Sequence, residues 1–240
     1  MDTWREDLFG LLLNTNTDTT AEATFSAICE YSRKLGFEYI AYGFQLPYPI
    51  TRPKICLLNN YPRTWQEHYE KQGYLLTDPT VIHGRRNQEP LLWNDQAFAS
   101  NMALWQDAQD HGIRSGWAQS CLEINGSGSM LSLCRGSEPL TTGELKSIEL
   151  QMRWLVQVAH LNLSRKIVAQ EAHTNWPSLT PREREVLQWT ADGKSALDIA
   201  DILNLSKGAI DFHLSNCLRK LQSPNKTAAV ARAILMGLIR

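Results

Sequence analysis

Thr180-Pro-Arg-Glu-Arg-Glu-Val-Leu-Gln-Trp-Thr-Ala-Asp-Gly193 is the stretch that decides the fold of the C-terminal part of this chain. It predicts a helix that begins after Thr180, because threonine caps helices and proline suits the first helical position. Glu183 stands where it can complete a capping box with Thr180. Gly193 predicts the end of this helix, since glycine readily adopts the left-handed conformation that follows a last turn.

Three more helices are predicted after Gly193. A short helix from Ser195, which repeats the capping-box spacing with Asp198, runs to Leu203. The Asn204-Leu205 turn separates it from a longer helix over 206–221, and a fourth helix follows Asn225. These four helices form one small C-terminal domain.

The helix over 206–221 is amphipathic. Its apolar positions recur at helical spacing on one face: Ile210, Leu214, Cys217, Leu218 and Leu221. Its polar positions form the opposite face: Lys207, Asp211, Ser215, Asn216, Arg219 and Lys220. Two helices joined by a tight turn, the second with a polar outer face, are typical of a helix-turn-helix that enters the major groove of DNA. The pattern alone leaves open a small helical bundle with a solvated face.

A resemblance decides between these alternatives. The quoted stretch resembles the opening of the LuxR-type helix-turn-helix domain, and four further groups continue the match at the expected spacing: Ile199-Ala200, Phe212-His213, Arg219-Lys220-Leu221 and Asn225-Lys226. The resemblance implies that 206–221 is the recognition helix and that double-stranded DNA is the partner.

The same resemblance implies which side chains contact DNA. Positions 211 and 215 face the bases in this family and are often basic or polar, but here they are Asp211 and Ser215. Aspartate can accept from cytosine N4, and serine can contact several bases. Lys207, Arg219 and Lys220 are placed to contact phosphates, which position the helix. Asn216 shares this polar face.

The charge distribution agrees with a polyanionic partner for the C-terminal part. The net charge of the 240 residues is −1, but residues 178–240 hold 9 Lys and Arg against 6 Asp and Glu, whereas residues 1–170 hold 15 against 18. A basic module on a slightly acidic body suggests that only the module meets nucleic acid.

The composition excludes several classes of protein. Apolar runs are too short for a membrane span, and the acidic start MDTWREDLFG is unlike a secretory signal. The five cysteines are odd in number, widely spaced and lack a C-x-x-C pair. Reduced thiols in the cytoplasm are therefore expected, without a disulfide framework, a metal site or a cofactor.

Residues 1–170 predict a mixed domain. Helices are expected around 4–12, 25–35, 62–73, 97–110 and 142–168, and strands over 38–45, 54–59, 116–124 and 129–135. The Asn125-Gly126 pair predicts a hairpin between the last two strands. Thr141 and Glu144 have capping-box spacing at the start of the last helix. This order predicts an α+β fold, in which an antiparallel sheet carries helices on both faces.

The stretch from Gln170 to Pro177 lacks apolar periodicity and ends in proline. We therefore expect a linker over 171–177 between a domain over 1–170 and the DNA-binding domain over 178–240.

Two other functions are weighed for the N-terminal domain. An enzyme is not favoured, because the chain lacks a G-x-S-x-G elbow, a His-x-x-x-His motif and a glycine-rich phosphate loop. A receiver domain of the response-regulator type would need alternating strands and helices in a parallel sheet. The chain shows paired strands instead.

Aromatic residues are dense around a single aspartate, Asp78. The aromatic residues lie in the stretches 60–69 and 90–93, and Asp78 lies between them in the stretch 77–80. This pattern is typical of an apolar pocket with a few polar anchors. From the residues alone, an aromatic core in which Asp78 only caps the helix after Pro79 is the favoured interpretation.

The N-terminal part resembles the acyl-homoserine lactone binding domain of LuxR-type receptors. The resemblance rests on Tyr61, Trp65, Tyr69, Asp78, Pro79, Trp93 and Gly116. It implies an α/β/α sandwich that holds the signal between the sheet and one helical layer. It also implies that the ligand is an N-acyl-homoserine lactone.

The resemblance also implies a role for each residue of the site. Trp65 would donate its indole N–H to the lactone carbonyl, and Asp78 would accept the amide N–H of the ligand. Tyr61 and Ser132 would donate to the amide carbonyl. Apolar and aromatic side chains would form the wall: Tyr69, Trp93, Leu104, Trp105, Ala108 and Ile113. We also expect the bulky Trp105 or Trp117 to shorten the space for the acyl chain.

Together these features predict a quorum-sensing transcription factor. The homodimer would form through the helix over 142–168 and the last helix, and would bind a palindromic promoter site. Two alternatives stay open: a repressor released by its ligand, and the same architecture responding to another small molecule or to a protein.

Overall fold

The computed structural model describes residues 3–13, 20–175 and 177–239. The chain forms two compact units. One comprises 1–46, 55–123 and 127–169, and the other comprises 170–240 with the loops 47–54 and 124–126. Among the described residues, no helix is long and apolar enough to cross a bilayer.

A five-stranded sheet is the centre of the N-terminal unit. Its strands are β1 (Tyr39–Gln45), β2 (Ile55–Asn59), β3 (Leu91–Leu92), β4 (Ser115–Leu122) and β5 (Gly128–Arg135). They lie in the order β2-β1-β5-β4-β3, and every neighbouring pair is antiparallel. Gly126 has a φ of 84° in the β4–β5 turn, as the Asn125-Gly126 pair predicted. The predicted antiparallel sheet is confirmed.

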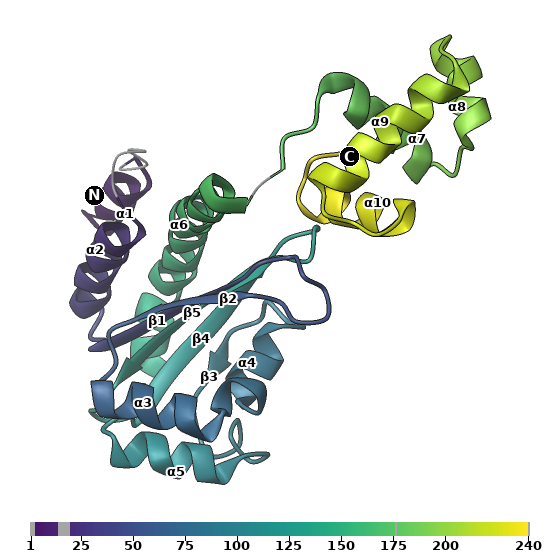
Figure 1. Cartoon of the computed structure of the whole chain (residues 1–240). Coiled ribbons are helices and arrows are strands. Elements are labelled where there is room, and N and C mark those ends of the chain that lie inside the picture. The colour runs from purple at the N-terminus through teal and green to yellow at the C-terminus, as the bar shows by residue number, and fades with distance from the viewer. Residues whose placement is uncertain (1–2, 14–19, 176, 240) are drawn as a thin grey trace. The chain divides into compact units, whose positions relative to one another are not determined.

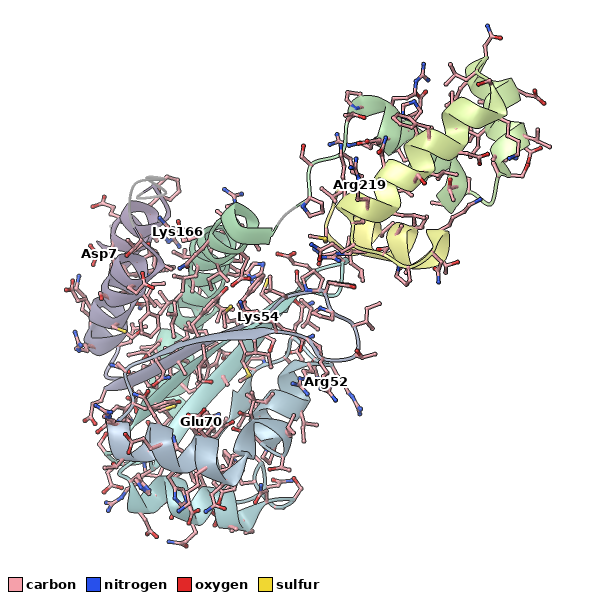
Figure 2. All side chains as sticks on the ribbon, viewed as in Figure 1. Asp7, Arg52, Lys54, Glu70, Lys166 and Arg219 are labelled. Carbon is pink, nitrogen blue, oxygen red and sulfur yellow. The ribbon has the colours of Figure 1, made fainter. Side chains whose placement is uncertain are left out.

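Helices cover both faces of this sheet (Figure 1). The first face packs against α1 (Thr3–Leu13), α2 (Ala21–Lys34) and α6 (Thr142–Asn175). The other face lies under α3 (Arg63–Gln72), the short 3-10 helix η1 (Tyr74–Leu76), α4 (Pro79–Gly84) and α5 (Met102–Asp110). Side chains fill the space between the sheet and each helical layer (Figure 2). The expected α/β/α sandwich is therefore present.

Alternation along the strands assigns side chains to the two faces. Ile40, Tyr42 and Phe44 of β1 are almost fully buried in the core beneath α2 and α6. Tyr39 lies on the other face, with its partner Cys134 of β5, because successive side chains of a strand point to opposite sides.

An ion pair between a buried arginine and a half-buried glutamate fixes the start of α6 to the end of β5. Arg135 is only 8% exposed, and its two terminal nitrogens donate to the two carboxylate oxygens of Glu144 at 2.6 and 2.9 Å. The N–H of Glu144 donates to the Thr141 hydroxyl, so Thr141 caps the helix as predicted. The Glu144 side chain bonds Arg135 rather than the cap, and these bonds hold the pKa of Glu144 below its usual range.

Two predicted helix boundaries were wrong. The helix expected from residue 97 begins at Met102, because the side chain of Asn101 accepts from the N–H of Leu104 and caps it there. The helix expected to end at 168 continues to Asn175. Loss of apolar periodicity does not end a helix by itself, and the first breaker is Pro177. Much of the predicted linker is therefore helical, while Trp176 lies outside the described residues.

Four helices form the C-terminal domain: α7 (Pro181–Ala191), α8 (Ala196–Leu203), α9 (Lys207–Lys220) and α10 (Lys226–Leu235). The capping boxes predicted at Thr180 and Ser195 are both formed. Asn204 has a φ of 52°, a left-handed conformation that asparagine tolerates better than most residues, and it makes the turn between α8 and α9. The predicted helix-turn-helix is confirmed.

Glu183 joins α7 to α9. Its side chain is 5% exposed, and Oε2 accepts from the Thr180 N–H at 2.8 Å and from Nζ of Lys220 at 2.6 Å. Burial by itself would raise the pKa of Glu183. The bonds from Lys220 and Thr180 outweigh burial, and the pKa lies below its usual range. One carboxylate therefore both caps α7 and holds the end of α9 against it.

Replacing Glu183 with Gln should lower the free energy of unfolding of the C-terminal domain by about 2 kcal/mol, the usual value of a hydrogen bond to a charged group. A carboxyl with a lowered folded-state pKa stabilises the fold above its unfolded pKa of about 4.3 and loses this effect as pH falls through the folded value. The difference between wild type and Glu183→Gln should therefore shrink below about pH 4. Hydrogen exchange of the α9 amides at increasing urea concentrations measures both effects.

The matched control is Glu185→Gln. Glu185 pairs with Arg182 at the surface, where both side chains are more than 40% exposed, so its loss should cost less than about 0.5 kcal/mol. Equal losses for the two variants would contradict the structural role of Glu183.

Candidate functional site

One aromatic cluster lies between the sheet and the α3–α5 layer, and we call it the sensor-face cluster. Its buried members are Trp65, Phe98, Leu104, Trp105, Ala108, Ile113 and Cys134. Partly buried side chains pack around them: Tyr39, Tyr61, Tyr69, Tyr74, Trp93 and Ala97. The structure thus brings together residues from five separate stretches of the chain, including eight of the ten expected ligand contacts.

Asp78 borders this cluster with both carboxylate oxygens engaged. Oδ1 accepts from the N–H and the hydroxyl of Thr80, at 2.8 and 2.7 Å, and caps α4. Oδ2 accepts from the hydroxyl of Tyr69 at 2.9 Å. The two interpretations of Asp78 are therefore compatible, because one oxygen caps the helix while the other faces an aromatic side chain of the cluster.

Asp78 is a buried acid, 7% exposed. Burial raises the pKa of Asp78 above its usual range, although the bonds from Thr80 and Tyr69 oppose this rise. A carboxylate oxygen has capacity for more than one hydrogen bond. Oδ2 can consequently accept from a second donor in an apolar environment, where such a bond is strong.

Tyr61 of the cluster and Ser132 of β5 lie on the same side of the sheet. The Tyr61 hydroxyl is 3.2 Å from Sγ of Cys134, and burial raises the pKa of Tyr61 well above its usual range. Ser132 is 4% exposed and stands two residues before Cys134 on β5, so the two side chains share a face. Both hydroxyls are therefore available on one side of the sheet.

Trp65 of α3 is 4% exposed and is surrounded by rings. Tyr69 meets it edge-on with centroids 5.6 Å apart, and His111 lies 5.3 Å from it. Sequence reasoning missed His111 and also His68, which stacks on Trp65 at 6.1 Å. The helical spacing of Trp65 and His68 could have indicated that His68 lies beside Trp65. His111 follows α5, and only the tertiary fold places it beside Trp65.

Asp107 links α3 and α5 above Trp65. Its Oδ2 is 2.6 Å from Nε2 of His68 and accepts from the Tyr74 hydroxyl at 2.6 Å. These bonds hold the pKa of Asp107 below its usual range. The helical layer over the cluster is therefore fixed by a polar network that the sequence did not reveal.

Trp93 and Trp105 enclose the end of the sensor-face cluster that lies away from Trp65 and His111. A Cβ on Gly116 would lie 2.5 Å from the Trp93 ring, so only glycine allows that ring to lie on β4. Trp105 stacks on Phe98 at 4.6 Å and donates its indole N–H to Asp95 at 2.8 Å. Sequence reasoning missed Phe98, although its spacing of seven residues from Trp105 is a helical spacing.

Trp117 lies on the opposite face of the sheet. It is 1% exposed and belongs to the core beneath α2 and α6, together with Leu133, its partner on β5. The expectation that Trp117 shortens a ligand site was therefore wrong, and the reason is strand alternation. Trp105 does belong to the sensor-face cluster.

The cluster has the chemistry of a binding site for a mostly apolar small molecule. Aromatic and aliphatic walls surround a few polar groups: the hydroxyls of the partly buried Tyr61 and Tyr69, and the buried Asp78 and Ser132. This is the usual composition of a ligand pocket, in which few polar groups fix orientation. Within the described ranges, no group of His, Cys, Asp and Glu is arranged to hold a metal ion.

The polar face of α9 is a second candidate site. Lys207 pairs with Asp211 at 2.6 Å, and Arg219 donates to Oδ1 of Asn216 at 2.9 Å. Ser215 is exposed. The ammonium of Lys220 bonds the buried Glu183 instead, so this expected phosphate contact has a structural partner inside the domain.

Comparison with known families agrees with both sites. Residues 20–163 match the family model described as "Autoinducer binding domain". Residues 177–233 match the model described as "Bacterial regulatory proteins, luxR family".

Individual relatives span the whole chain. The chain is 36% identical over 241 residues to the transcriptional activator protein AnoR of Acinetobacter nosocomialis, with all of both chains covered. It is 36% identical over 222 residues to the HTH-type quorum-sensing regulator RhlR of Pseudomonas aeruginosa, covering 91% of this chain and 90% of RhlR.

Solved structures are similar as well. A structure of SdiA, a regulator of Escherichia coli, in complex with octanoyl-rac-glycerol superposes with a TM-score of 0.84 at 32% identity, covering 99% of this chain and 97% of SdiA. The N-acylhomoserine lactone dependent CepR2 of Burkholderia cenocepacia gives a TM-score of 0.62 at 31% identity over 69% of this chain and 95% of CepR2.

These relatives are transcriptional regulators rather than enzymes, and the matched sensor domain takes a small-molecule signal rather than a catalytic cofactor. The two matches also follow the two halves of the molecule, with the sensor-face cluster in the first and α9 in the second. The chain belongs to the LuxR family of quorum-sensing transcriptional regulators, with an autoinducer-binding domain followed by a helix-turn-helix DNA-binding domain.

Proposed function

We propose that this regulator binds an N-acyl-homoserine lactone in the sensor-face cluster and then binds a palindromic DNA site as a homodimer. Residues 1–170 would sense the ligand, 171–177 would connect the domains, and 178–240 would bind DNA. The observation that carries the ligand assignment is Asp78, a buried carboxylate with one oxygen turned to Tyr69 of the cluster.

The chemistry of an acyl-homoserine lactone complements the cluster. The ligand's amide N–H would donate to Oδ2 of Asp78, while its amide carbonyl would accept from Tyr61 and Ser132. The lactone carbonyl would accept from the Trp65 indole N–H, and aromatic and aliphatic side chains would enclose the ring and acyl chain. Related proteins support this ligand class, because octanoyl-rac-glycerol and acyl-homoserine lactones both join a polar head to an acyl chain.

Ligand binding would stabilise the sensor domain by mass action. A ligand that binds only the folded state adds to folding free energy, and the gain grows with its concentration relative to its Kd. Burial of the ligand among the rings of the cluster would complete that part of the core. The signal would thus raise the amount of folded, DNA-binding protein.

Replacing Asp78 with Asn tests the ligand site without removing the cap of α4. The Asn carbonyl oxygen can still accept from Thr80, but its NH₂ group cannot accept an amide N–H. We expect the lactone concentration for half-maximal response to rise roughly 30-fold or more, as for the loss of a hydrogen bond to a charged group. A reporter assay with a series of N-acyl-homoserine lactones measures this change.

Thr80→Val is the matched control. It removes a hydroxyl bond to Oδ1 and leaves Oδ2 unchanged, so the lactone response should stay close to that of wild type. An unchanged response of Asp78→Asn would show that Asp78 is only a helix cap and would overturn the ligand assignment.

An apolar stripe on α6 supports dimerisation through this helix. Leu150, Trp154 and Leu161 are 53%, 52% and 40% exposed, and their spacing places them on one side of the helix. Exposed apolar patches mark interaction sites, and tryptophan often contributes strongly to them. Ile234 of the last helix, 47% exposed, is a second candidate contact between copies.

Trp154→Ala should weaken the dimer at least roughly 30-fold, as expected for a central tryptophan. Sedimentation velocity of the full chain at several concentrations measures the dimer constant. Leu76→Ala is the control, because Leu76 is 73% exposed on η1, beyond the opposite face of the sheet. A dimer that Trp154→Ala leaves unchanged would place the interface elsewhere.

Arg219 is proposed as a phosphate contact of the recognition helix. Arg219→Ala should weaken binding to all DNA sequences about equally and reduce the slope of log K against log salt by about 2, because each protomer of the dimer loses one phosphate contact. Fluorescence anisotropy at several salt concentrations measures the slope. Lys220→Ala should instead lower the stability of the domain, because Lys220 bonds Glu183. A salt slope that Arg219→Ala does not change would exclude the phosphate contact.

A further inference from the structure

The outermost side of α9 carries an aromatic residue. Gly208, Phe212, Ser215 and Arg219 follow one another at spacings of four, three and four residues and therefore share one side of the helix. All four are exposed, while Ile210, Leu214 and Cys217 on the opposite side are buried. Phe212 is 63% exposed, although a phenylalanine normally gains free energy by burial.

The neighbours of Phe212 let its ring project from the helix. Gly208 has no side chain and Ser215 has a short one, so the residues one turn before and after Phe212 on this stripe are small. The ring meets the half-buried His213 imidazole edge-on, with centroids 5.7 Å apart. Phe212 is therefore the bulkiest apolar group on the outer side of the recognition helix.

The charged groups beside Phe212 bind one another. Asp211 accepts from Lys207 at 2.6 Å, and this pair lies on the flank of the helix, about 100° around the axis from Phe212. The ion pair offsets the charge that Asp211 would bring close to phosphates. The negative side chain at position 211 is thus compatible with the approach of α9 to DNA.

We infer that Phe212 is a sequence-reading residue whose ring contacts the C5 methyl group of a thymine in the major groove. The methyl is the apolar feature by which thymine differs from the other bases there, and phenylalanine is one of the side chains that contact it. The stripe that carries Phe212 also carries Arg219, the proposed phosphate contact, so both reach the same groove. Each half-site should therefore prefer thymine at one position.

Thymine-to-deoxyuridine replacement tests this inference. The full chain, produced in cells supplied with N-acyl-homoserine lactones of several chain lengths, first selects duplexes from a random DNA library. Each thymine of the selected duplex is then replaced in turn by deoxyuridine, which keeps base pairing and lacks the methyl group. Wild type should bind about fourfold more weakly when the contacted thymine is replaced, as expected for one buried methyl.

Phe212→Ala should bind the unmodified duplex at least about fourfold more weakly and should no longer distinguish deoxyuridine from thymine. Because Phe212 is exposed, the thermal unfolding of the Phe212→Ala variant should match that of the wild-type protein. Phe9→Ala, which removes an aromatic ring 61% exposed on α1, should keep both the affinity and the discrimination.

Two outcomes would overturn the inference. In the first, wild type tolerates deoxyuridine at every position, so no methyl is read. In the second, Phe212→Ala still loses affinity at the same thymine, so another residue reads it.

Discussion

The separation of the two faces of one antiparallel sheet is the constraint on which the sensor domain depends. Because side chains alternate along a strand, β1, β4 and β5 each supply residues to both faces. One face carries Ile40, Tyr42 and Trp117 and packs against α2 and α6 as a core. The other carries Tyr39, Ser132 and Cys134 and supports the sensor-face cluster. A shift of register by one residue would exchange these roles, so stability and ligand chemistry depend on the same pairing.

Two carboxylates, the half-buried Glu144 and the buried Glu183, anchor helices α6 and α9. Glu144 binds Arg135 at the start of α6, and Glu183 binds Lys220 at the end of α9. Each of these glutamates takes part both in the cap of its own helix and in an ion pair with a residue of another element. The start of each helix is therefore coupled to the tertiary structure. The pKa of each carboxyl is lowered, since its partners favour the charged form. Helices α6 and α9 are thus each fixed at one end by a specific contact rather than by apolar packing alone.

Sequence reasoning was most successful where the signal is local. The capping boxes at Thr180 and Ser195, the turn at Asn204 and the hairpin at Gly126 were predictable, because each depends on residues only a few positions apart. Sequence reasoning failed where a helix boundary depends on a residue outside the apolar pattern, or on the absence of a helix breaker. Asn101 caps α5 five residues later than the apolar pattern suggested, and α6 continues beyond its last apolar repeat because nothing before Pro177 breaks it. Trp117 was assigned to the ligand side because composition does not show which face a strand residue takes.

By itself the sequence determined the fold class of the two domains, since capping motifs and helical spacing depend on neighbouring residues. Its resemblance to LuxR-type receptors indicated the family and the recognition helix. Only the tertiary structure decided which contacts each side chain makes. It placed His111 beside Trp65, gave the two oxygens of Asp78 different partners, and turned Lys220 toward Glu183. The contacts of Trp65 with His111, of Tyr69 with Asp78 and of Lys220 with Glu183 join residues on different elements, so no local pattern records them. Burial makes such contacts strong, and burial exists only once the chain has folded.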